Sequence, residues 1–94
     1  MIAIHTADAP FADPPRLVAL VNLRWEAAED AYVLLHPGGP IRLNASAGAI
    51  LARCDGTLPE RTIVAQLEEE FDASGIADEV RGFLLTAHEE GWIV

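Results

Sequence analysis

The sequence predicts an α+β, winged-helix-like domain in which a three-stranded antiparallel sheet is followed by three helices. In the first half, apolar residues alternate or form short blocks bounded by turn residues, which is typical of strands. In the second half they recur at i, i+3, i+4 and i+7 between Gly- and Pro-containing breaks, which indicates helices. The chain has 94 residues, 51% of them hydrophobic, enough for one small core.

The chain is expected to begin with an extended segment, residues 1–16, ahead of a domain spanning residues 17–94. Three prolines in this segment oppose regular structure. Its apolar residues, Ile2, Ile4 and Phe11, suit it to cover the outer face of the sheet, either in its own chain or by exchange in a second copy. We therefore expect the segment to be ordered against the sheet and a homodimer to form at high concentration.

Three strands are expected, joined by short connections into a meander. The first covers residues 17–25, where odd positions are apolar, and the second covers residues 32–35. Pro37 and Gly38 fit the central positions of a type II turn, in which the second central residue takes a positive φ. The third strand, residues 41–43, points Ile41 and Leu43 to one face and Arg42 to the other.

Three helices follow, each with its own start and stop signals. Asn44 is expected to cap the first helix and Gly56 to end it, and residues 57–60 (TLPE) resemble a capping box that opens the second. The third is expected from about Ile76 to Gly91. The apolar faces of the three helices are expected to bury Ala47, Ile50, Leu51 and Cys54 in the first, Ile63, Val64, Leu67 and Phe71 in the second, and Val80, Phe83, Leu84 and Ala87 in the third.

Charge and composition exclude several classes of function. The formal net charge is −9 and all six basic residues are Arg, so the chain should repel nucleic acid. An acidic winged-helix transcription regulator is disfavoured for the same reason, because the third helix offers several carboxylates against Arg81 alone. No signal peptide or membrane-spanning stretch is recognisable. With a single cysteine, the chain is expected to be cytoplasmic.

No set of residues suggests catalysis, a cofactor or a metal. His5, His36 and His88 are scattered, and no metal-ligand spacing is present. Cys54 lies on the apolar face of the first helix, where a core thiol is expected and not a nucleophile. The chain is therefore expected not to be an enzyme.

The outer edge of the third strand is the feature left to explain. A free edge is usually blunted, and Pro40 and Arg42 do this in part. A protected edge and a functional edge are both open at this point. In the functional alternative, a partner peptide adds a fourth strand beside residues 41–43 and packs in a groove under the third helix.

The segments RWEAAEDAYVLL, LNASAGAIL followed by CDG, and the closing EEGWI, in this order and spacing, resemble the PqqD family, whose members take part in the biosynthesis of pyrroloquinoline quinone (PQQ). The resemblance runs from about Pro15 to Val94. It implies a non-catalytic peptide chaperone, a recognition element for ribosomally made and modified peptides. Such a protein binds the precursor peptide PqqA and presents it to the radical S-adenosylmethionine enzyme PqqE.

The resemblance also implies a contact surface on the third strand and third helix. The residues carried over are Ile41, Arg42, Leu43, Val80, Phe83, Leu84, Ala87 and His88. The turn departs from the family pattern, because His36, Gly38 and Pro40 stand where an aromatic residue, Glu and an apolar residue are usual. Since Pro40 has no N–H, we expect donors for pairing from Ile41 onward. A recognition element of another peptide pathway, such as that of a lasso peptide, is the alternative.

Overall fold

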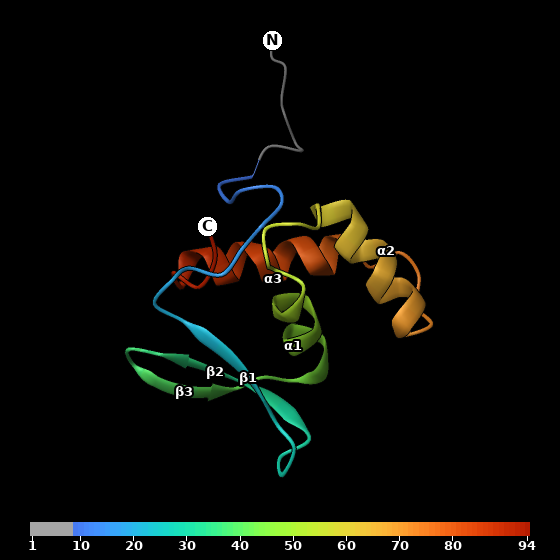
Figure 1. Ribbon diagram of the computed structural model, residues 1–94. Coiled ribbons are helices and arrows are strands. Elements are labelled where there is room, and N and C mark those ends of the chain that lie inside the picture. Colours follow the sequence, from blue (N-terminus) through green and yellow to red (C-terminus); the bar gives the residue numbers. More distant parts are fainter. Residues whose placement is uncertain (1–8) are drawn as a thin grey trace.

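The computed structural model describes residues 9–94, which form a sheet with helices packed on one face (Figure 1). Three strands are followed by three helices, as the sequence predicts. The elements are β1 (Asn22–Glu26), β2 (Ala31–His36), β3 (Gly39–Arg42), α1 (Ala45–Ala52), α2 (Glu60–Glu70) and α3 (Ala77–Glu89). The predicted fold class is confirmed.

The sheet is an antiparallel meander in the order β1-β2-β3. The fully buried Leu34 lies at its centre, opposite Leu23 on one side and Ile41 on the other. The first strand is shorter than the predicted residues 17–25. Leu17 instead forms an isolated bridge with Ile93, because the chain before β1 pairs with the C-terminal tail and not with β2.

The β2–β3 turn differs from the predicted type II turn. Positive φ falls on Gly39, at +116°, and not on Gly38. A type II turn would need it at Gly38, whereas here the positive φ falls on the first residue of β3, which pairs with His36 across a two-residue connection. The Gly38 N–H donates a hydrogen bond of 3.1 Å to Nδ1 of His36, so a side chain of the turn itself satisfies this backbone donor.

Helix α1 begins as predicted and ends earlier. The Asn44 side chain accepts a hydrogen bond of 2.8 Å from the Ala47 N–H. The helix ends at Ala52, so Gly56 is not its stop. Instead, the segment after the helix pairs with the N-terminal segment, and the Gly56 N–H donates to the Pro15 carbonyl at 3.0 Å.

The predicted capping box of α2 is wrong. The Thr57 hydroxyl donates to Asp55 within the preceding loop, and the Glu60 carboxylate accepts from Arg81. The Glu60 N–H is satisfied by a residue far away in sequence, since it donates to Oδ1 of Asp13 at 2.8 Å. The N-terminal segment thus supplies the cap that the local sequence lacks.

Helix α3 ends close to the predicted position. The Trp92 N–H donates to the Ala87 carbonyl and the Gly91 N–H to the His88 carbonyl, which is the Schellman arrangement. The tail then turns back and buries Ile93. Helix α1 lies very close to β2, because a Cβ at Gly48 would stand 2.8 Å from Cδ2 of Tyr32.

The N-terminal segment does not cover the outer face of the sheet over its described part, residues 9–16. Phe11 is buried in the main core beside the helices, with the Arg81 guanidinium 5.9 Å from its ring centroid. The expected contacts of residues 1–8, including Ile2 and Ile4, lie outside the described residues. Val33 and Leu35, on the outer face, are half-buried. The expected homodimer stays a prediction.

Candidate functional site

The outer edge of β3 carries backbone groups that β2 does not use. The Leu43 N–H donates to the Tyr32 carbonyl at 3.0 Å, and the register pairs Ile41 with Leu34. Because successive residues of a strand point their N–H and C=O groups in opposite directions, the groups of Ile41 and Leu43 face β2. Those of Arg42 and the carbonyl of Pro40 face outward. The first outward donor is therefore Arg42, which lies within the expected range from Ile41 onward.

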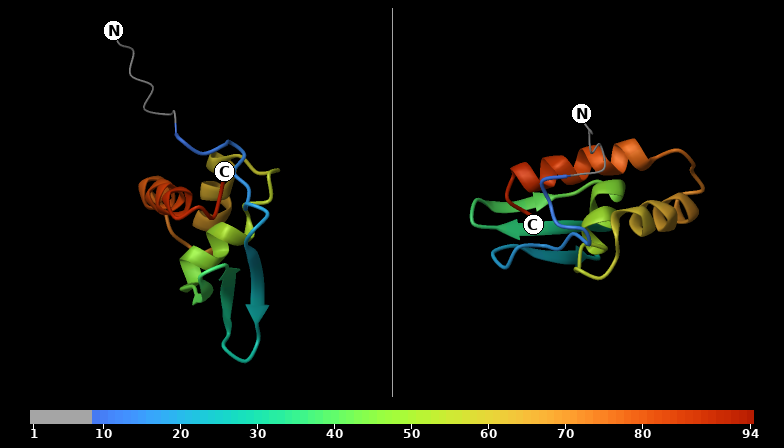
Figure 2. Two further views of the ribbon diagram at one scale, coloured as in Figure 1. Left: turned by 90° about the vertical axis from the view of Figure 1, so that its left-hand side faces the viewer. Right: turned by 90° about the horizontal axis from the view of Figure 1, so that it is seen from above.

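The β3 edge lies on the same side of the molecule as α3. The second view of Figure 2 shows β1, β2, β3 and α3 in this order across the molecule, and Figure 1 shows α3 in the helical layer above the sheet. The side chains of Ile41 and Leu43 share a face with Leu34, and Leu43 belongs to the same core cluster as Val80. A segment placed against the β3 edge would therefore have α3 beside it.

An apolar groove of about 360 Å³ continues from the end of β3 between α1 and α3. We call it the α1–α3 groove. Apolar side chains make up most of its lining, with Asn44, Ser46 and Glu79 as the polar members. The apolar lining consists of Ala47, Ile50, Leu67, Phe71, Ala73, Ile76, Val80 and Phe83. Such a surface suits an apolar side chain of a ligand held by a few polar groups.

The predicted contact residues fall into three groups in the structure. Six of them meet in or against one apolar cluster, namely Ile41, Leu43, Val80, Phe83, Leu84 and Ala87. Within this set, Ile41 and Phe83 are only partly buried, while the other four are buried and form the floor beneath the surface. His88 is half-buried near the C-terminal end of α3. The contact surface as a whole stays a prediction.

Arg42 is the member whose side chain lies away from the groove. Its Nε stands 3.0 Å from a carboxylate oxygen of Glu29, so the side chain crosses to the β1–β2 turn. This follows from the alternation of the strand, which sends Arg42 to the face opposite Ile41. Arg42 can therefore bind a partner strand through its backbone groups, while its side chain pairs with Glu29 in the β1–β2 turn.

Several groove residues were missed by the reasoning from sequence. Phe71 was assigned to the core by helical spacing, yet it is 43% exposed because α2 ends at Glu70 and leaves Phe71 at the rim. Ile76 ends the α2–α3 connection, where its N–H donates to Glu68 Oε2 at 3.2 Å. The one signal in the sequence was the position of Phe71, an aromatic residue at the end of the helical pattern, where the helix can stop and leave the ring exposed.

The titratable groups in the described part of the chain do not form a reactive site. Burial, with a smaller contribution from the charge of Asp55, raises the pKa of the Cys54 thiol to about 12, so the thiol stays protonated. Within residues 9–94, no three His, Cys, Asp or Glu side chains gather as a metal site would require. Over the same residues, no helix is long and apolar enough to cross a membrane.

Comparison with known proteins gives concordant results. Residues 31–93 match the family model of coenzyme PQQ synthesis protein D (PqqD). The PqqA binding protein of Methylococcus capsulatus is 47% identical over 77 residues, which cover 82% of this chain and 83% of that protein. The PqqA binding protein of Azotobacter vinelandii is 43% identical over 82 residues, covering 86% and 89%.

A solved structure is also similar. It is the solution structure of the PqqD portion of Methylobacterium extorquens PqqCD, described as a functional, stand-alone recognition element for ribosomally synthesised and post-translationally modified peptides. The two chains superpose with a TM-score of 0.72 at 26% identity, over 89% of this chain and 94% of that one.

Proposed function

We propose that this chain, which belongs to the PqqD family, binds the precursor peptide PqqA during PQQ biosynthesis and presents it to the radical S-adenosylmethionine enzyme PqqE. The role is non-catalytic. The observation that carries the proposal is a strand edge that no other strand of residues 9–94 occupies, beside an apolar groove, which is the combination that β-augmentation requires.

The peptide pairs with the outward backbone groups of β3. Arg42 offers an N–H and a carbonyl, and Pro40 offers a carbonyl only. A peptide residue opposite Arg42 can thus make a complete pair of ladder hydrogen bonds, whereas pairing beside Pro40 lacks one donor. Each such bond contributes only about 0.5–1.5 kcal/mol net, so the edge alone gives weak binding.

The groove supplies the remaining affinity and the specificity. An apolar side chain of the peptide enters the α1–α3 groove next to Phe83, over the buried Val80. Burying one large apolar side chain contributes roughly 1.5–3 kcal/mol. Together these contacts suggest an interface below about 1,200 Å² and a Kd nearer micromolar than picomolar, about −8 kcal/mol.

The charge of the chain also bears on the ligand. With a net charge of −9, the protein favours peptides that are not themselves strongly acidic. Glu79, at the groove, offers a carboxylate to a basic residue of the peptide. We place the complex in the cytoplasm, since the one thiol, Cys54, is free and suits a reducing compartment.

Titration of the chain with synthetic PqqA tests the proposal. Phe83→Ala should weaken peptide binding by about tenfold, because it removes an aromatic wall of the groove. Leu85→Ala is the matched control on the same helix, where Leu85 is exposed and does not line the groove. Equal effects of the two variants, or no binding by the unmodified chain, would contradict the proposed site.

A further inference from the structure

Two exposed aromatic side chains share a second cavity, which lies beside the proposed peptide site. Trp25 of β1 is 53% exposed and Phe71, just after α2, is 43% exposed. Both line a cavity of about 510 Å³ together with Tyr32, Leu43 and Asn44. Single exposed apolar residues are ordinary, but two large aromatics on one hollow are typical of an interaction surface. We call this the Trp25–Phe71 surface.

The Trp25–Phe71 surface adjoins the proposed peptide site. Asn44 and Phe71 line both this cavity and the α1–α3 groove, and Asn44 follows the end of β3 closely. A peptide paired with β3 therefore leaves the strand beside this surface at one of its two ends. An enzyme that acts on a neighbouring part of the peptide can contact the Trp25–Phe71 surface at the same time.

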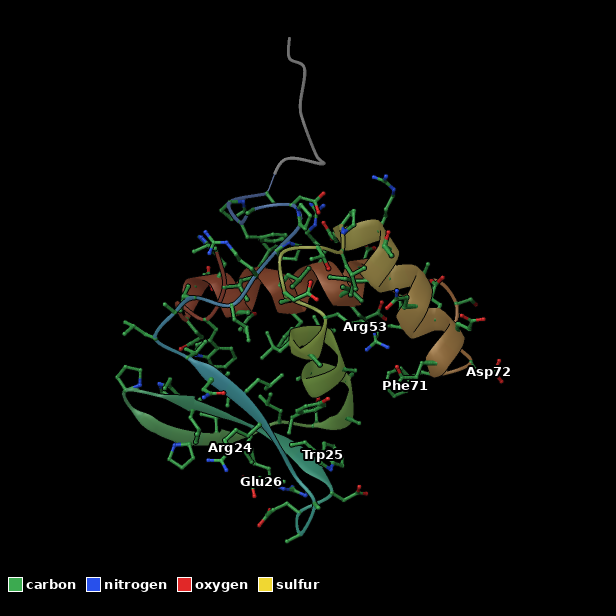
Figure 3. All side chains as sticks on the ribbon, in the orientation of Figure 1. Arg24, Trp25, Glu26, Arg53, Phe71 and Asp72 are labelled. Atoms are coloured by element: carbon green, nitrogen blue, oxygen red, sulfur yellow. The ribbon has the colours of Figure 1, made fainter. Side chains whose placement is uncertain are left out.

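The rim of the surface is acidic. Among the ion pairs of residues 9–94, Arg42 is matched by Glu29 and Arg53 by Glu70. Asp30 lines the cavity without an ion pair in that part of the chain, and Asp72 follows Phe71 directly. Figure 3 shows Asp72 beyond Phe71 at the end of α2, on the same side of the molecule as Trp25. A complementary partner has an apolar centre ringed by Lys or Arg.

We propose that the Trp25–Phe71 surface docks the peptide-modifying enzyme through a basic, apolar-centred patch, so that the enzyme lies where the bound peptide leaves β3. This inference rests on the proposed function. A second copy of the chain is a poor occupant, because both copies would bring a charge of −9 and the same acidic rim.

Truncation of Trp25 tests the proposal on the full chain, because Trp25 lines this cavity and not the α1–α3 groove. Trp25→Ala should weaken the binding of purified PqqE by at least about tenfold, because aromatic anchors dominate most interfaces. The affinity of this variant for PqqA should change by less than about threefold, because the peptide uses the α1–α3 groove next to Phe83. Leu20→Ala is the matched control, since Leu20 is 77% exposed and lines neither cavity.

Removal of the rim charges tests the electrostatic part separately. Asp30 and Asp72 have φ values of 51° and 52°, a region that Asn tolerates as well as Asp does. Asp30→Asn/Asp72→Asn should therefore keep the backbone while slowing association with PqqE and flattening its dependence on salt. An unchanged association rate and salt dependence would overturn the acidic-rim argument.

The outcomes separate this inference from the proposed function. Enzyme binding that survives in Trp25→Ala, or that falls equally in Leu20→Ala, overturns the docking surface. A Trp25→Ala variant that loses peptide affinity as strongly as enzyme affinity also overturns it, because the surface would then belong to the peptide. If the unmodified chain binds PqqE but not PqqA, the proposed function fails while the docking result stands by itself.

Discussion

The two edges of the sheet are alike in hydrogen-bonding capacity and different in surroundings. By the register with β2, β1 points the backbone groups of Leu23 and Trp25 outward, as β3 does with those of Arg42. Beyond β3 lie α3 and an apolar groove of about 360 Å³. Beside β1 the exposed indole of Trp25 packs edge-on against Tyr32, with ring centroids 5.1 Å apart.

This difference shows what makes a strand edge a binding site. Ladder hydrogen bonds contribute about the same on either edge, and little net, because the unbound edge is hydrated. Selectivity must therefore come from the surface beside the edge. The β3 side offers the largely apolar α1–α3 groove, whereas the hollow beside β1 mixes Leu17, Val21 and Leu23 with Arg16 and Asp55. The β1 edge with Trp25 is left for a different kind of contact, in which side chains and not backbone groups meet the partner.

The largest expected effect is on peptide binding and comes from proline on the β3 edge. Arg42→Pro removes the outward N–H without removing a bond to β2, and proline is tolerated at such edge positions. PqqA binding should weaken by at least about tenfold, or about 1.4 kcal/mol, measured by calorimetric titration. Arg42→Ala keeps the N–H and should bind nearly as the unmodified chain does.

The matched change on the other edge is Leu23→Pro, compared with Leu23→Ala because Leu23 is partly buried. It removes an outward N–H of β1, so PqqA binding should not fall relative to Leu23→Ala. If proline at residue 23 abolished binding and proline at residue 42 did not, the two edges would have been assigned the wrong way round.

The next expected effect is on the stability of the fold. It should not change which edge of the sheet binds the peptide. Gly48→Ala places a Cβ 2.8 Å from Cδ2 and 3.1 Å from Cβ of Tyr32, so α1 must move away from β2. Overpacking of this kind costs typically about 1–3 kcal/mol. Urea unfolding should show this loss in the free energy of unfolding. An unchanged unfolding midpoint would mean that α1 is not held against Tyr32 as described.

A smaller loss is expected from the distant cap of α2. Asp13→Ala leaves the Glu60 N–H without its acceptor and should lower the free energy of unfolding by about 0.5–2 kcal/mol. Asp13→Asn keeps an acceptor oxygen and should cost less. Neither variant touches an edge of the sheet, so PqqA affinity should stay the same. A change in affinity would show that the helices and the edges are coupled.

The sequence predicts local features of both edges well and long-range ones poorly. Alternation alone assigns Ile41 and Leu43 to the inner face, and Asn44 is recognisable as a cap because its partner lies three residues away. The Asp13–Glu60 cap spans 47 residues, so no local pattern could indicate it. The predicted capping box is wrong because the Thr57 hydroxyl donates a hydrogen bond to the nearby Asp55 and does not cap α2.

The candidate site is predictable only in part for the same physical reason. Strand and helix spacing assigns Ile41 and Phe83 to apolar faces, and the resemblance to the PqqD family predicts that they share a surface. Both pack against one cluster. The α1–α3 groove arises where three helices fail to close completely, and that depends on where α2 ends at Glu70. Helical periodicity assigns Phe71 to the core, but periodicity does not indicate that the helix ends one residue earlier, at Glu70. The outward donor of β3 required the register with β2, which periodicity does not fix.

The smallest effect concerns the loop between α1 and α2, which belongs to neither edge. Hydrogen bonds from the Thr57 hydroxyl and then the Thr57 N–H lower the pKa of Asp55 below its usual 3.8. A lowered folded-state pKa stabilises the protein above the unfolded value of 3.8, and this stabilisation is lost as pH falls through the folded pKa.

Thr57→Val removes the larger of the two causes and should raise the pKa of Asp55 toward 3.8, measured by NMR titration of its carboxyl carbon. Because Asp55 is exposed, the change in stability at neutral pH should be small. PqqA binding above pH 5 or so should not change. An unshifted Asp55 titration would show that the hydroxyl contributes nothing to the lowered pKa.

Residue-resolved amide hydrogen exchange, with and without PqqA, tests the central claim most directly. In the free chain the Leu43 N–H is already bonded to Tyr32, while the Arg42 N–H faces outward. Binding should slow exchange at Arg42, along with smaller changes next to Phe83, and leave the outward amides of Leu23 and Trp25 as they were. Protection at Leu23 and Trp25 with none at Arg42 would contradict the account, because the peptide would then pair with β1.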